Sequence, residues 1–312
     1  MTKRKKPIEI PARAETATVR VGRKNVRLTS LSKVFFPELG ITKRGLLSYY
    51  AEIADVLVPH LADRAMVMKR YPNGIGSKYF FAKRTPAGSP AWLRKCHIEH
   101  ASGNVIDFPV VEDRATLLWL INLGCVDLNP WYSRCDDVDR PDVLNFDLDP
   151  VAPAGFGQVR EAALLVREAL ERIGARSYVK TSGSKGMHVY VPIARGPKQK
   201  RVWRFAKRLA KELEASAPEL ITAEYRIAKR PPSRVLVDYN QNAWGSTLAS
   251  IYSVRPRRGA TVSTPVEWAE VENEVATEAF TIETVPERIR ERGDLWRKVL
   301  WQRGRFDLEV HL

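Results

Sequence analysis

The chain has 312 residues, of which 44% are apolar and 28% are charged, and this composition is typical of a soluble globular protein rather than a mainly disordered one. Lysine and arginine outnumber aspartate and glutamate by 51 to 36, so the net charge is +15. The three cysteines have no CxxC spacing, which argues against a disulfide scaffold and against a structural zinc site. No apolar run approaches the roughly 18 residues that a membrane helix needs. We therefore expect a cytoplasmic protein.

The positive charge is spread along the chain. Residues 1–30 carry a net charge of +7 and residues 261–312 a net charge of −4, which leaves +12 on the residues between them. Such a field attracts polyanions, so nucleic acid is the expected partner. A basic surface that serves only solubility is the alternative.

Apolar periodicity predicts helices and strands that alternate along one body. Residues 1–15 are rich in Lys, Arg and Pro and are expected to form a basic mobile arm. Strands are expected over 17–30 (a hairpin), 65–71, 78–84, 104–110, 142–150, 187–193, 234–239 and 248–255. Helices are expected after Thr42 and over 115–124, 159–173 and 200–215.

The order of these elements predicts the fold class. Several strands come in adjacent pairs, so we expect an α/β fold with mixed sheets and flanking helices rather than a purely parallel sheet. Residues 16–275 would form the main domain, and residues 276–312 a helical segment packed on it.

Two aspartates end the strand expected over 142–150. Alternate residues of a strand share a face, so Asp147 and Asp149 point to the same side as Asn145. Two carboxylates on one face repel each other unless a cation lies between them, and Mg²⁺ and Mn²⁺ prefer oxygen ligands. Two solvated acids before a proline turn are the alternative, but a row of three polar residues on an apolar strand favours a site.

A loop of small residues, Ser182 to Gly186, precedes the strand over 187–193. Glycines let backbone N–H groups approach a phosphate closely, and Lys185 adds positive charge. The loop is not a Walker motif, because its glycine spacing differs and no Ser or Thr follows the lysine directly. By itself it predicts a phosphate site weakly, and His188 alone is more often a packed strand histidine than a ligand.

A third carboxylate, Asp238, ends the apolar strand over 234–239 and is followed by Gln241. With Asp147 and Asp149 it could complete a two-metal site, in which ions about 3.5–4 Å apart clamp the attacking and leaving oxygens of a phosphoryl transfer. For Asp238 alone, an ordinary surface aspartate that starts a turn is the alternative.

In this order, the segments FDLDP, SGSKGMH and VLVDYNQN resemble the polymerase domain of bacterial and archaeal ligase D proteins, a member of the archaeo-eukaryotic primase superfamily. The resemblance extends from about Val19 to about Trp268 through LSKVFFPELGITKRGLLSYY, VMKRYPNG, YFFAKR, RCDDVDRPD, AKR and IYSVRPR. It implies a primase-like catalytic core with an RRM-like sheet and flanking helices.

The resemblance also implies roles for single residues. The catalytic and metal-binding positions that it implies are Asp147, Asp149 and Asp238. The implied nucleotide-binding positions are Ser182, Lys185, Gly186, His188, Arg230, Gln241 and Arg255. The implied DNA 5′-phosphate pocket is Lys33, Lys43 and Ser30, and the implied template contacts are Phe80, Phe81, Arg70 and Lys83. Two positions depart from the family: Ser30 stands where an Asn is frequent, and Asn129 stands where many members have a His.

The function that the resemblance implies is a nucleotidyltransferase. It would extend a primer 3′-OH at gaps and double-strand breaks, on a template or as a terminal transferase, with two Mn²⁺ ions (Mg²⁺ as the alternative) and with a preference for ribonucleotides. It would act in non-homologous end joining at the nucleoid, on DNA with a 5′-phosphate, with Ku and an ATP-dependent DNA ligase as partners. No ligase or phosphoesterase segment is visible, so those activities are expected on separate chains or in a longer protein.

Two other functions stay open from the sequence. A haloacid-dehalogenase-type phosphatase also carries Asp-x-Asp after an apolar strand, but it needs Thr or Val two residues further on. Here Pro150 follows the second aspartate and Val151 lies beyond it, so the pattern is met only in part. A non-catalytic module that binds DNA ends would need only the basic field, which gives no reason for three aspartates at strand ends.

Overall fold

A six-stranded sheet carries the polar positions predicted above, in a computed structural model that describes residues 6–312. The strand order is β15 (Ile221–Thr222), β16 (Val235–Asp238), β12 (Val143–Pro150), β14 (Met187–Pro192), β13 (Tyr178–Thr181) and β17 (Pro265–Val266). Neighbouring strands are antiparallel, except that β15 and β16 are parallel. The prediction of an α/β fold with a mixed sheet is thus confirmed.

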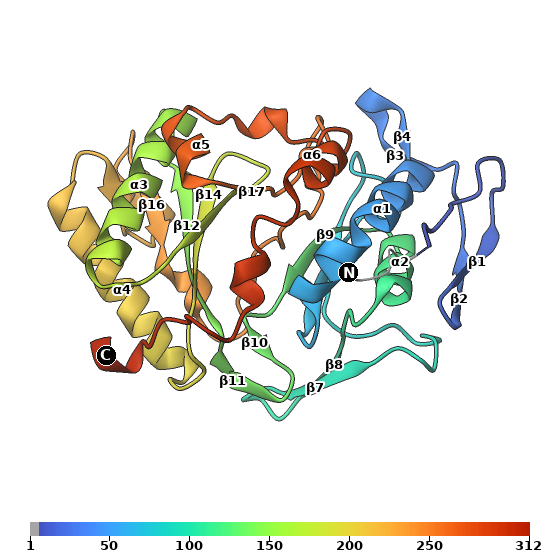
Figure 1. Cartoon of the computed structure of the whole chain (residues 1–312), viewed down its shortest axis with the longest axis horizontal. Helices are drawn as coiled ribbons and strands as arrows, with labels where there is room; N and C mark the ends of the chain where they lie inside the picture. Colours follow the sequence, from blue (N-terminus) through green and yellow to red (C-terminus); the bar gives the residue numbers. More distant parts are fainter. Residues whose placement is uncertain (1–5) are drawn as a thin grey trace.

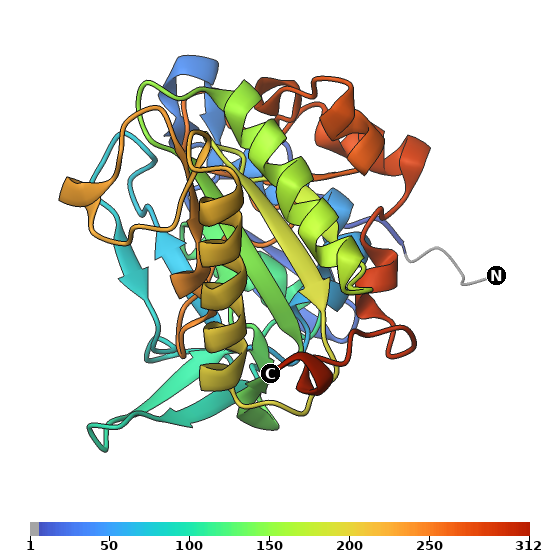
Figure 2. The ribbon, with the colours of Figure 1, turned by 90° about the vertical axis from the view of Figure 1, so that its left-hand side faces the viewer.

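Two amphipathic helices, α3 (Phe156–Arg172) and α4 (Gln199–Ser216), lie across one face of this sheet (Figure 2). Each buries residues at helical spacing, which is the pattern that predicted it. The buried apolar residues of the two helices include Val159, Ala162, Val166, Leu170, Val202, Phe205, Leu209 and Leu213. The opposite face of the sheet is therefore free to carry polar groups.

The N-terminal half of the chain lies on the other side of the molecule (Figure 1). Its helices are α1 (Lys43–Leu61), which Thr42 caps, and α2 (Arg114–Asn122). Its three-stranded sheet has the order β6 (Phe80–Ala82), β5 (Met66–Arg70) and β9 (Cys125–Pro130). Paired strands form β1 (Ala17–Val21) with β2 (Lys24–Leu28), β3 (Val34–Phe36) with β4 (Ile41–Thr42), β7 (Lys95–Glu99) with β8 (Val105–Pro109), and β10 (Ser133–Arg134) with β11 (Asp137–Pro141).

The strand predicted over 248–255 is wrong. Backbone bonds from this segment go to several different partners: the N–H of Ser250 donates to Leu128 O and that of Tyr252 to Ser263 O. Tyr252 also has a φ of +56°, which is incompatible with an extended strand. The segment is apolar because it is buried between other elements, and burial without a regular ladder gives the same residue pattern as a strand.

Both ends of the described chain are bonded to the body. Residues 1–5 of the expected arm lie outside the described residues. In the rest of the arm, the carbonyl of Lys6 accepts a hydrogen bond from Arg114, and the carbonyl of Ala14 accepts one from Arg44, each at 2.9 Å. At the other end, α5 (Trp268–Glu272) and α6 (Val285–Arg292) are followed by single 3₁₀ turns. The indole N–H of Trp296 donates to the carbonyl of Val179 at 3.2 Å, so the C-terminal segment lies against β13. Within residues 6–312, no helix combines the length and the apolarity needed to cross a membrane.

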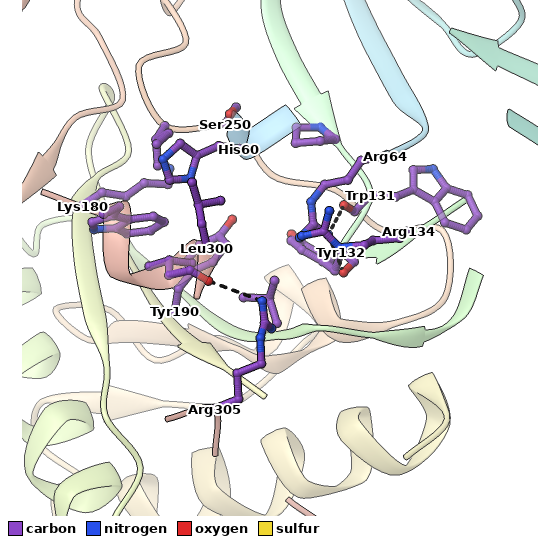
Figure 3. A pocket seen from close by; sticks show the side chains of 15 residues that line it. His60, Arg64, Trp131, Tyr132, Arg134, Lys180, Tyr190, Ser250, Leu300 and Arg305 are labelled. Carbon is purple, nitrogen blue, oxygen red and sulfur yellow. Dashed lines mark hydrogen bonds between the residues drawn. The ribbon is translucent and has the colours of Figure 1, made fainter. Parts of the chain in front are cut away.

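A small pocket lies where the N-terminal half, the central sheet and the C-terminal segment meet (Figure 3). Its volume is about 60 Å³, and side chains from all three parts line it, among them His60, Lys180, Tyr190 and Leu300. Lys180 of β13, Tyr190 of β14 and Val143 of β12 all line it, so the pocket lies directly against the central sheet.

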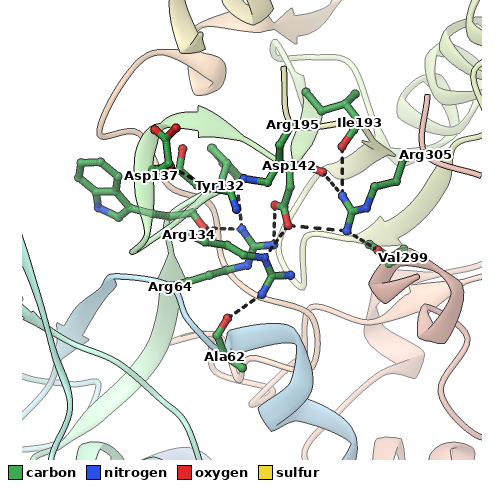
Figure 4. Close-up of polar contacts among 12 residues, drawn as sticks. Ala62, Arg64, Tyr132, Arg134, Asp137, Asp142, Ile193, Arg195, Val299 and Arg305 are labelled. Atoms are coloured by element: carbon green, nitrogen blue, oxygen red, sulfur yellow. Dashed lines mark hydrogen bonds and ion pairs between the residues drawn. The ribbon is translucent and has the colours of Figure 1, made fainter. Parts of the chain in front are cut away.

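Next to the pocket, three arginines surround one buried carboxylate, Asp142 (Figure 4). The guanidinium of Arg64 lies 2.6 Å and that of Arg134 2.9 Å from its oxygens, and Arg305 donates to its backbone carbonyl at 2.7 Å. Burial alone would raise the pKa of Asp142, but the charges of Arg64 and Arg134 hold this pKa below its ordinary value. The cluster therefore joins the start of β12 to the N-terminal half and to the C-terminal segment.

We expect Asp142→Ala to lower the free energy of unfolding by about 3–5 kcal/mol, because it leaves buried arginine charges without a partner. Urea unfolding followed by circular dichroism measures this. The exposed pair of Asp136 with Arg195, at 2.8 Å, supplies the control, since Asp136→Ala should cost at most about 1 kcal/mol. Because the pKa of Asp142 is depressed in the folded protein, its contribution is present at neutral pH and is lost as the pH falls through that pKa. Equal costs for the two variants would contradict the prediction.

Candidate active site

One row of polar residues crosses four strands of the central sheet. The register pairs Asp147 of β12 with Asp238 of β16 on one side and with His188 of β14 on the other. His188 in turn pairs with Lys180 of β13. Residues opposite one another in antiparallel strands project to the same face. The sheet therefore brings together aspartates that are about 90 positions apart in the sequence, and Asp149 follows two residues further along β12.

Close polar contacts connect three members of the row. Nε2 of His188 lies 3.1 Å from Oδ1 of Asp147, and its Nδ1 lies 2.7 Å from Nζ of Lys180. All three side chains are buried, with exposed fractions of 6% for Asp147, 3% for His188 and 0% for Lys180. Both ring nitrogens of His188 are thus occupied by protein groups, although the resemblance implied a nucleotide contact for this residue. The sequence did not predict Lys180 as part of the site. The one feature that could have indicated it is a lysine between Val179 and Thr181, at a position where a strand buries its side chains.

Negative charge is crowded at this place. Burial, followed by the charge of Asp238, raises the pKa of Asp147 to about 7. The charge of Asp147, followed by burial, raises the pKa of Asp149 to about 7. Burial lowers the pKa of Lys180 well below its ordinary value, although the charge of Asp147 opposes this shift. A cation between the carboxylates would relieve their repulsion.

The three aspartates suit a hard divalent cation as a set of oxygen donors. In the described positions, however, two of them face protein partners. Asp238 accepts from the N–H of Asn240 at 2.8 Å and from the amide of Gln241 at 3.1 Å, and Oδ1 of Asp147 lies 3.1 Å from Nε2 of His188. Among residues 6–312, no three His, Cys, Asp or Glu side chains converge as a finished metal cluster. The donor set therefore fits such ions chemically, and the side chains would have to turn toward them.

The loop from Ser182 to Gly186 is closed on itself and packed against β12. The Ser182 hydroxyl accepts from the N–H groups of Ser184 and Gly186, each at 3.1 Å. A Cβ on Gly186 would lie 2.1 Å from the carbonyl oxygen of Leu148 and 3.0 Å from Oδ1 of Asp149. The loop thus lies directly beside the second aspartate, with the exposed Lys185 at its tip.

Two arginines expected at the nucleotide lie close to the aspartates. Arg230 donates to the carbonyls of Glu224 at 3.1 Å and Tyr225 at 3.0 Å, and its charge acts to lower the pKa of Asp149. The Arg255 guanidinium lies 3.5 Å from a carboxylate oxygen of Asp127, and its buried Nε has no hydrogen-bond partner among the described residues. Positive groups therefore face the carboxylates, as the binding of a triphosphate would require.

The residues expected to bind a 5′-phosphate gather at the start of α1. Lys43 is the first residue of that helix; its backbone N–H donates to the carbonyl of Lys33, and its ammonium donates to the carbonyl of Thr29, each at 2.7 Å. Burial and then the charge of Lys33 lower the pKa of Lys43 to about 8. Ser30 lies beside them with its carbonyl 3.2 Å from the N–H of Lys33. A helix N-terminus beside two lysines favours an anion.

The residues expected to contact a template form an exposed aromatic strand. Phe80 and Phe81 of β6 are 46% and 57% exposed, and the Arg70 guanidinium lies 5.1 Å from the Phe80 ring. Two neighbours were not predicted from the sequence: Tyr79, which is 51% exposed, and Lys69, whose ammonium lies 4.2 Å from the Tyr79 ring. The expected contact Lys83 is exposed just beyond β6. Exposed rings with cations beside them suit unpaired bases.

Comparisons with known proteins decide the family. A model of the LigD primase-polymerase domain matches residues 42–296 of this chain. The chain belongs to this family. The resemblance drawn from the sequence and its primase-like fold are therefore confirmed, whereas the roles of single residues stay predictions.

Relatives of this LigD polymerase domain include longer proteins. The multifunctional non-homologous end joining protein LigD of Mycolicibacterium smegmatis is 35% identical over 272 residues, which cover 86% of this chain and 35% of that protein. The bifunctional non-homologous end joining protein LigD of Bacillus subtilis is 32% identical over 272 residues, which cover 86% of this chain and 43% of that protein. This chain thus spans less than half the length of either relative.

A solved structure supports the same assignment. The polymerase domain of Mycobacterium tuberculosis ligase D, in complex with DNA, matches with a TM-score of 0.82 and 31% identity over 88% of this chain and 97% of that one.

Asn129 is one of the two positions at which this chain departs from the LigD family. It is buried in β9, and its side-chain amide donates to the carbonyl of Asp127 at 3.1 Å. The position where many members have a His is therefore bonded within the protein.

Proposed function

We propose that this protein is a nucleotidyltransferase that adds nucleotides to DNA 3′ ends at gaps and double-strand breaks during end joining. The observation that carries the proposal is the meeting of Asp147, Asp149 and Asp238 on one face of the sheet, beside a phosphate-type loop, in a chain of the LigD polymerase family. The DNA-bound relative of the same fold supports DNA as the substrate. A place in end joining is supported by the names of the longer relatives. Ku and an ATP-dependent ligase as partners, and the nucleoid as the location, belong to the proposal through the family resemblance alone.

Each part of the site has a task in this proposal. Asp147 and Asp149 would hold two divalent cations, Mn²⁺ or Mg²⁺, and Asp238 would hold the one nearer the primer. When bound, such ions lower the pKa of an attacking hydroxyl and neutralise charge on a triphosphate. The loop around Lys185 would bind the triphosphate through the ammonium group of Lys185 and through backbone N–H groups. The side chains of Arg230, Gln241 and Arg255 would orient the nucleotide. The residues Phe80 and Phe81 would stack on template bases.

The deciding experiment is primer extension on a gapped duplex with ribo- and deoxynucleotides. We expect ribonucleotides to be incorporated more efficiently than deoxynucleotides, and Mn²⁺ to support more incorporation than Mg²⁺, with some untemplated addition at blunt ends. Equal or reversed sugar preference at matched salt would contradict this prediction, and Asn129 would be the first residue to change. Release of phosphate from a small phosphoester without incorporation would favour the phosphatase, and DNA binding without either activity would favour an end-binding module.

A second experiment tests the 5′-phosphate pocket. A terminal phosphate carries more charge than an internal diester, and a charge-assisted hydrogen bond to it contributes roughly 1.5–3 kcal/mol. Part of this free energy should appear as tighter binding to a gap with a 5′-phosphate than to a gap with a 5′-hydroxyl. Replacing Lys33 and Lys43 with alanine should remove this discrimination. Binding is titrated at fixed salt, because non-specific affinity changes steeply with ionic strength.

The control for the pocket is a pair of exposed lysines on another face, Lys198 and Lys200 at the start of α4. Replacing both with alanine should weaken the binding of the two gapped duplexes equally, because only the general positive field of the protein is reduced. A wild-type protein that binds both ends with the same affinity would show that the pocket is wrongly assigned.

A further inference from the structure

Lys180 is a fully buried lysine with a complete set of acceptors. Its Nζ lies 2.7 Å from Nδ1 of His188, 2.9 Å from the carbonyl oxygen of Ala249 and 2.5 Å from the hydroxyl of Ser263. A carbonyl oxygen only accepts, and the Ser263 hydroxyl donates to the carbonyl of Thr181 at 3.0 Å, so it accepts from the lysine. An ammonium has three N–H donors, and the geometry offers one acceptor for each.

The contact with Lys180 decides which nitrogen of His188 carries the proton. A neutral imidazole has one donor and one acceptor, so when Nδ1 accepts from Lys180 the proton lies on Nε2. Nε2 is the nitrogen that lies 3.1 Å from Oδ1 of Asp147, so the positive end of its N–H bond then faces that carboxylate. In the other tautomer, the Nε2 lone pair would face a carboxylate oxygen at the same distance, which is repulsive.

This outcome does not depend on whether Lys180 is charged. A neutral amine has two N–H donors, which Ala249 O and His188 Nδ1 would accept, and the Ser263 hydroxyl could turn to the amine lone pair. In both states the lysine donates to Nδ1, as long as Asp147 is ionised. The register supports the same arrangement, because Lys180, His188 and Asp147 stand opposite one another on three neighbouring strands.

We propose that Lys180 is a positioning residue: it fixes His188 as the Nε2-protonated tautomer, and His188 thereby holds the Asp147 carboxylate in place for a metal ion. The two ring nitrogens of His188 contact Lys180 and Asp147, so the histidine links the lysine to the aspartate. The part of this inference that concerns metal binding rests on the proposed function, whereas the tautomer does not. Outer partners of this kind typically change metal affinity 10–100-fold when they are removed.

The first test needs no variant. The ¹⁵N shifts of histidine-labelled wild-type protein distinguish protonated from unprotonated ring nitrogens, and the His188 signals are identified as those missing from His188→Asn. We expect a protonated Nε2 and an unprotonated Nδ1 above about pH 8, where Asp147 is ionised. A protonated Nδ1 with a bare Nε2 would overturn the inference, whatever activity the protein has.

The second test separates positioning from mere packing. Lys180→Met removes the donor but keeps an apolar stem, and Ser263→Ala removes a different partner of the same ammonium while keeping the bond to His188. Titration with Mn²⁺ alone, followed by the electron paramagnetic resonance of the free ion, should show about tenfold weaker binding in Lys180→Met and less than a twofold change in Ser263→Ala. The two variants are compared after thermal unfolding confirms that each is folded.

The outcomes distinguish this inference from the proposed function. Unchanged Mn²⁺ affinity and an unchanged His188 tautomer in a folded Lys180→Met protein would overturn the inference. If that variant does not fold, Lys180→Gln takes its place; its amide NH₂ still offers N–H donors, so it should retain the wild-type tautomer. A wild-type protein with the expected tautomer but no Mn²⁺ binding would instead refute the metal site of the proposed function.

Discussion

Alanine at position 147 or 149 is expected to abolish nucleotide incorporation while leaving DNA binding largely intact. Asp147 and Asp149 lie on one face at the end of β12, and no other carboxylate of that strand could replace them. The contribution of a catalytic metal is several kcal/mol, so the rate of incorporation should fall at least about 10³-fold. The groups expected to contact DNA, at α1 and β6, lie outside this strand and should be unaffected.

The stability of a variant matched in shape, Asp149→Asn, helps to identify the cause of a lost activity. Burial and then the charge of Asp238 raise the pKa of Asp147 to about 7, and the charge of Asp147 and then burial raise the pKa of Asp149 to about 7. When no cation is present, their charges therefore destabilise the fold as the pH rises through that value. Asp149→Asn, which removes one charge with little change in shape, should therefore unfold at the same or a higher temperature than the wild type at pH 8 without metal. Loss of incorporation would then not be a consequence of unfolding.

Single-turnover extension of a labelled primer and titration of a gapped duplex measure the two effects. Asp136→Ala is the matched control, because Asp136 is an exposed aspartate paired with Arg195 outside the site. It should extend the primer at the wild-type rate. Extension near that rate by the variants at 147 or 149 would rule out the metal assignment.

The sequence predicted part of the site because strand geometry is local. A period of two places Asp147 and Asp149 on one face without knowledge of the rest of the fold. The neighbourhood of Asp147 and Asp238 depends instead on which strands pair, and no local pattern encodes that β16 lies beside β12. The order of motifs shared with the ligase D family supplied this information.

The residues that were missed have a common physical reason. Lys180 lies in a strand of four residues, and its role arises from a partner on the next strand, which periodicity does not show. For His188 the sequence could not show that both ring nitrogens are engaged, because this depends on Asp147 and Lys180 at once. The segment 248–255 was predicted as a strand because hydrophobicity reports burial, whereas a ladder needs a partner with free backbone groups.

Gly186 gives the second large effect that we expect, and the reason is space rather than backbone conformation. A Cβ at this position would lie 2.1 Å from the carbonyl oxygen of Leu148 and 3.0 Å from Oδ1 of Asp149. The first of these atoms belongs to the backbone of β12 and cannot rotate away. Gly186→Ala must therefore move the loop, the strand or both, and the atoms nearest to the displacement include a carboxylate of the proposed metal site.

The displacement should affect the proposed chemistry more than the fold. Extra atoms in a packed region typically cost 1–3 kcal/mol, which a domain of this size survives, whereas misplacement of a catalytic group by about 1 Å can lower a rate about 10²-fold. We expect Gly186→Ala to lower the rate of incorporation by at least that factor. A higher nucleotide concentration should also be needed for the half-maximal rate, because the displaced loop carries Lys185, which is proposed to bind the triphosphate. Extension kinetics and thermal unfolding measure both effects.

A second glycine supplies the control for this prediction. Gly157 lies in α3, where an added Cβ would lie 3.9 Å from the Arg160 side chain, so there is room for it. Gly157→Ala should leave incorporation unchanged and stabilise the helix by up to about 1 kcal/mol, since alanine restricts the unfolded chain and favours helix. If Gly186→Ala behaves in the same way, the loop does not fix the position of Asp149, and close approach of the two would not be a requirement of the site. If instead Gly186→Ala loses incorporation while unfolding within a few degrees of the wild type, the contact between loop and strand is a requirement of catalysis rather than of folding.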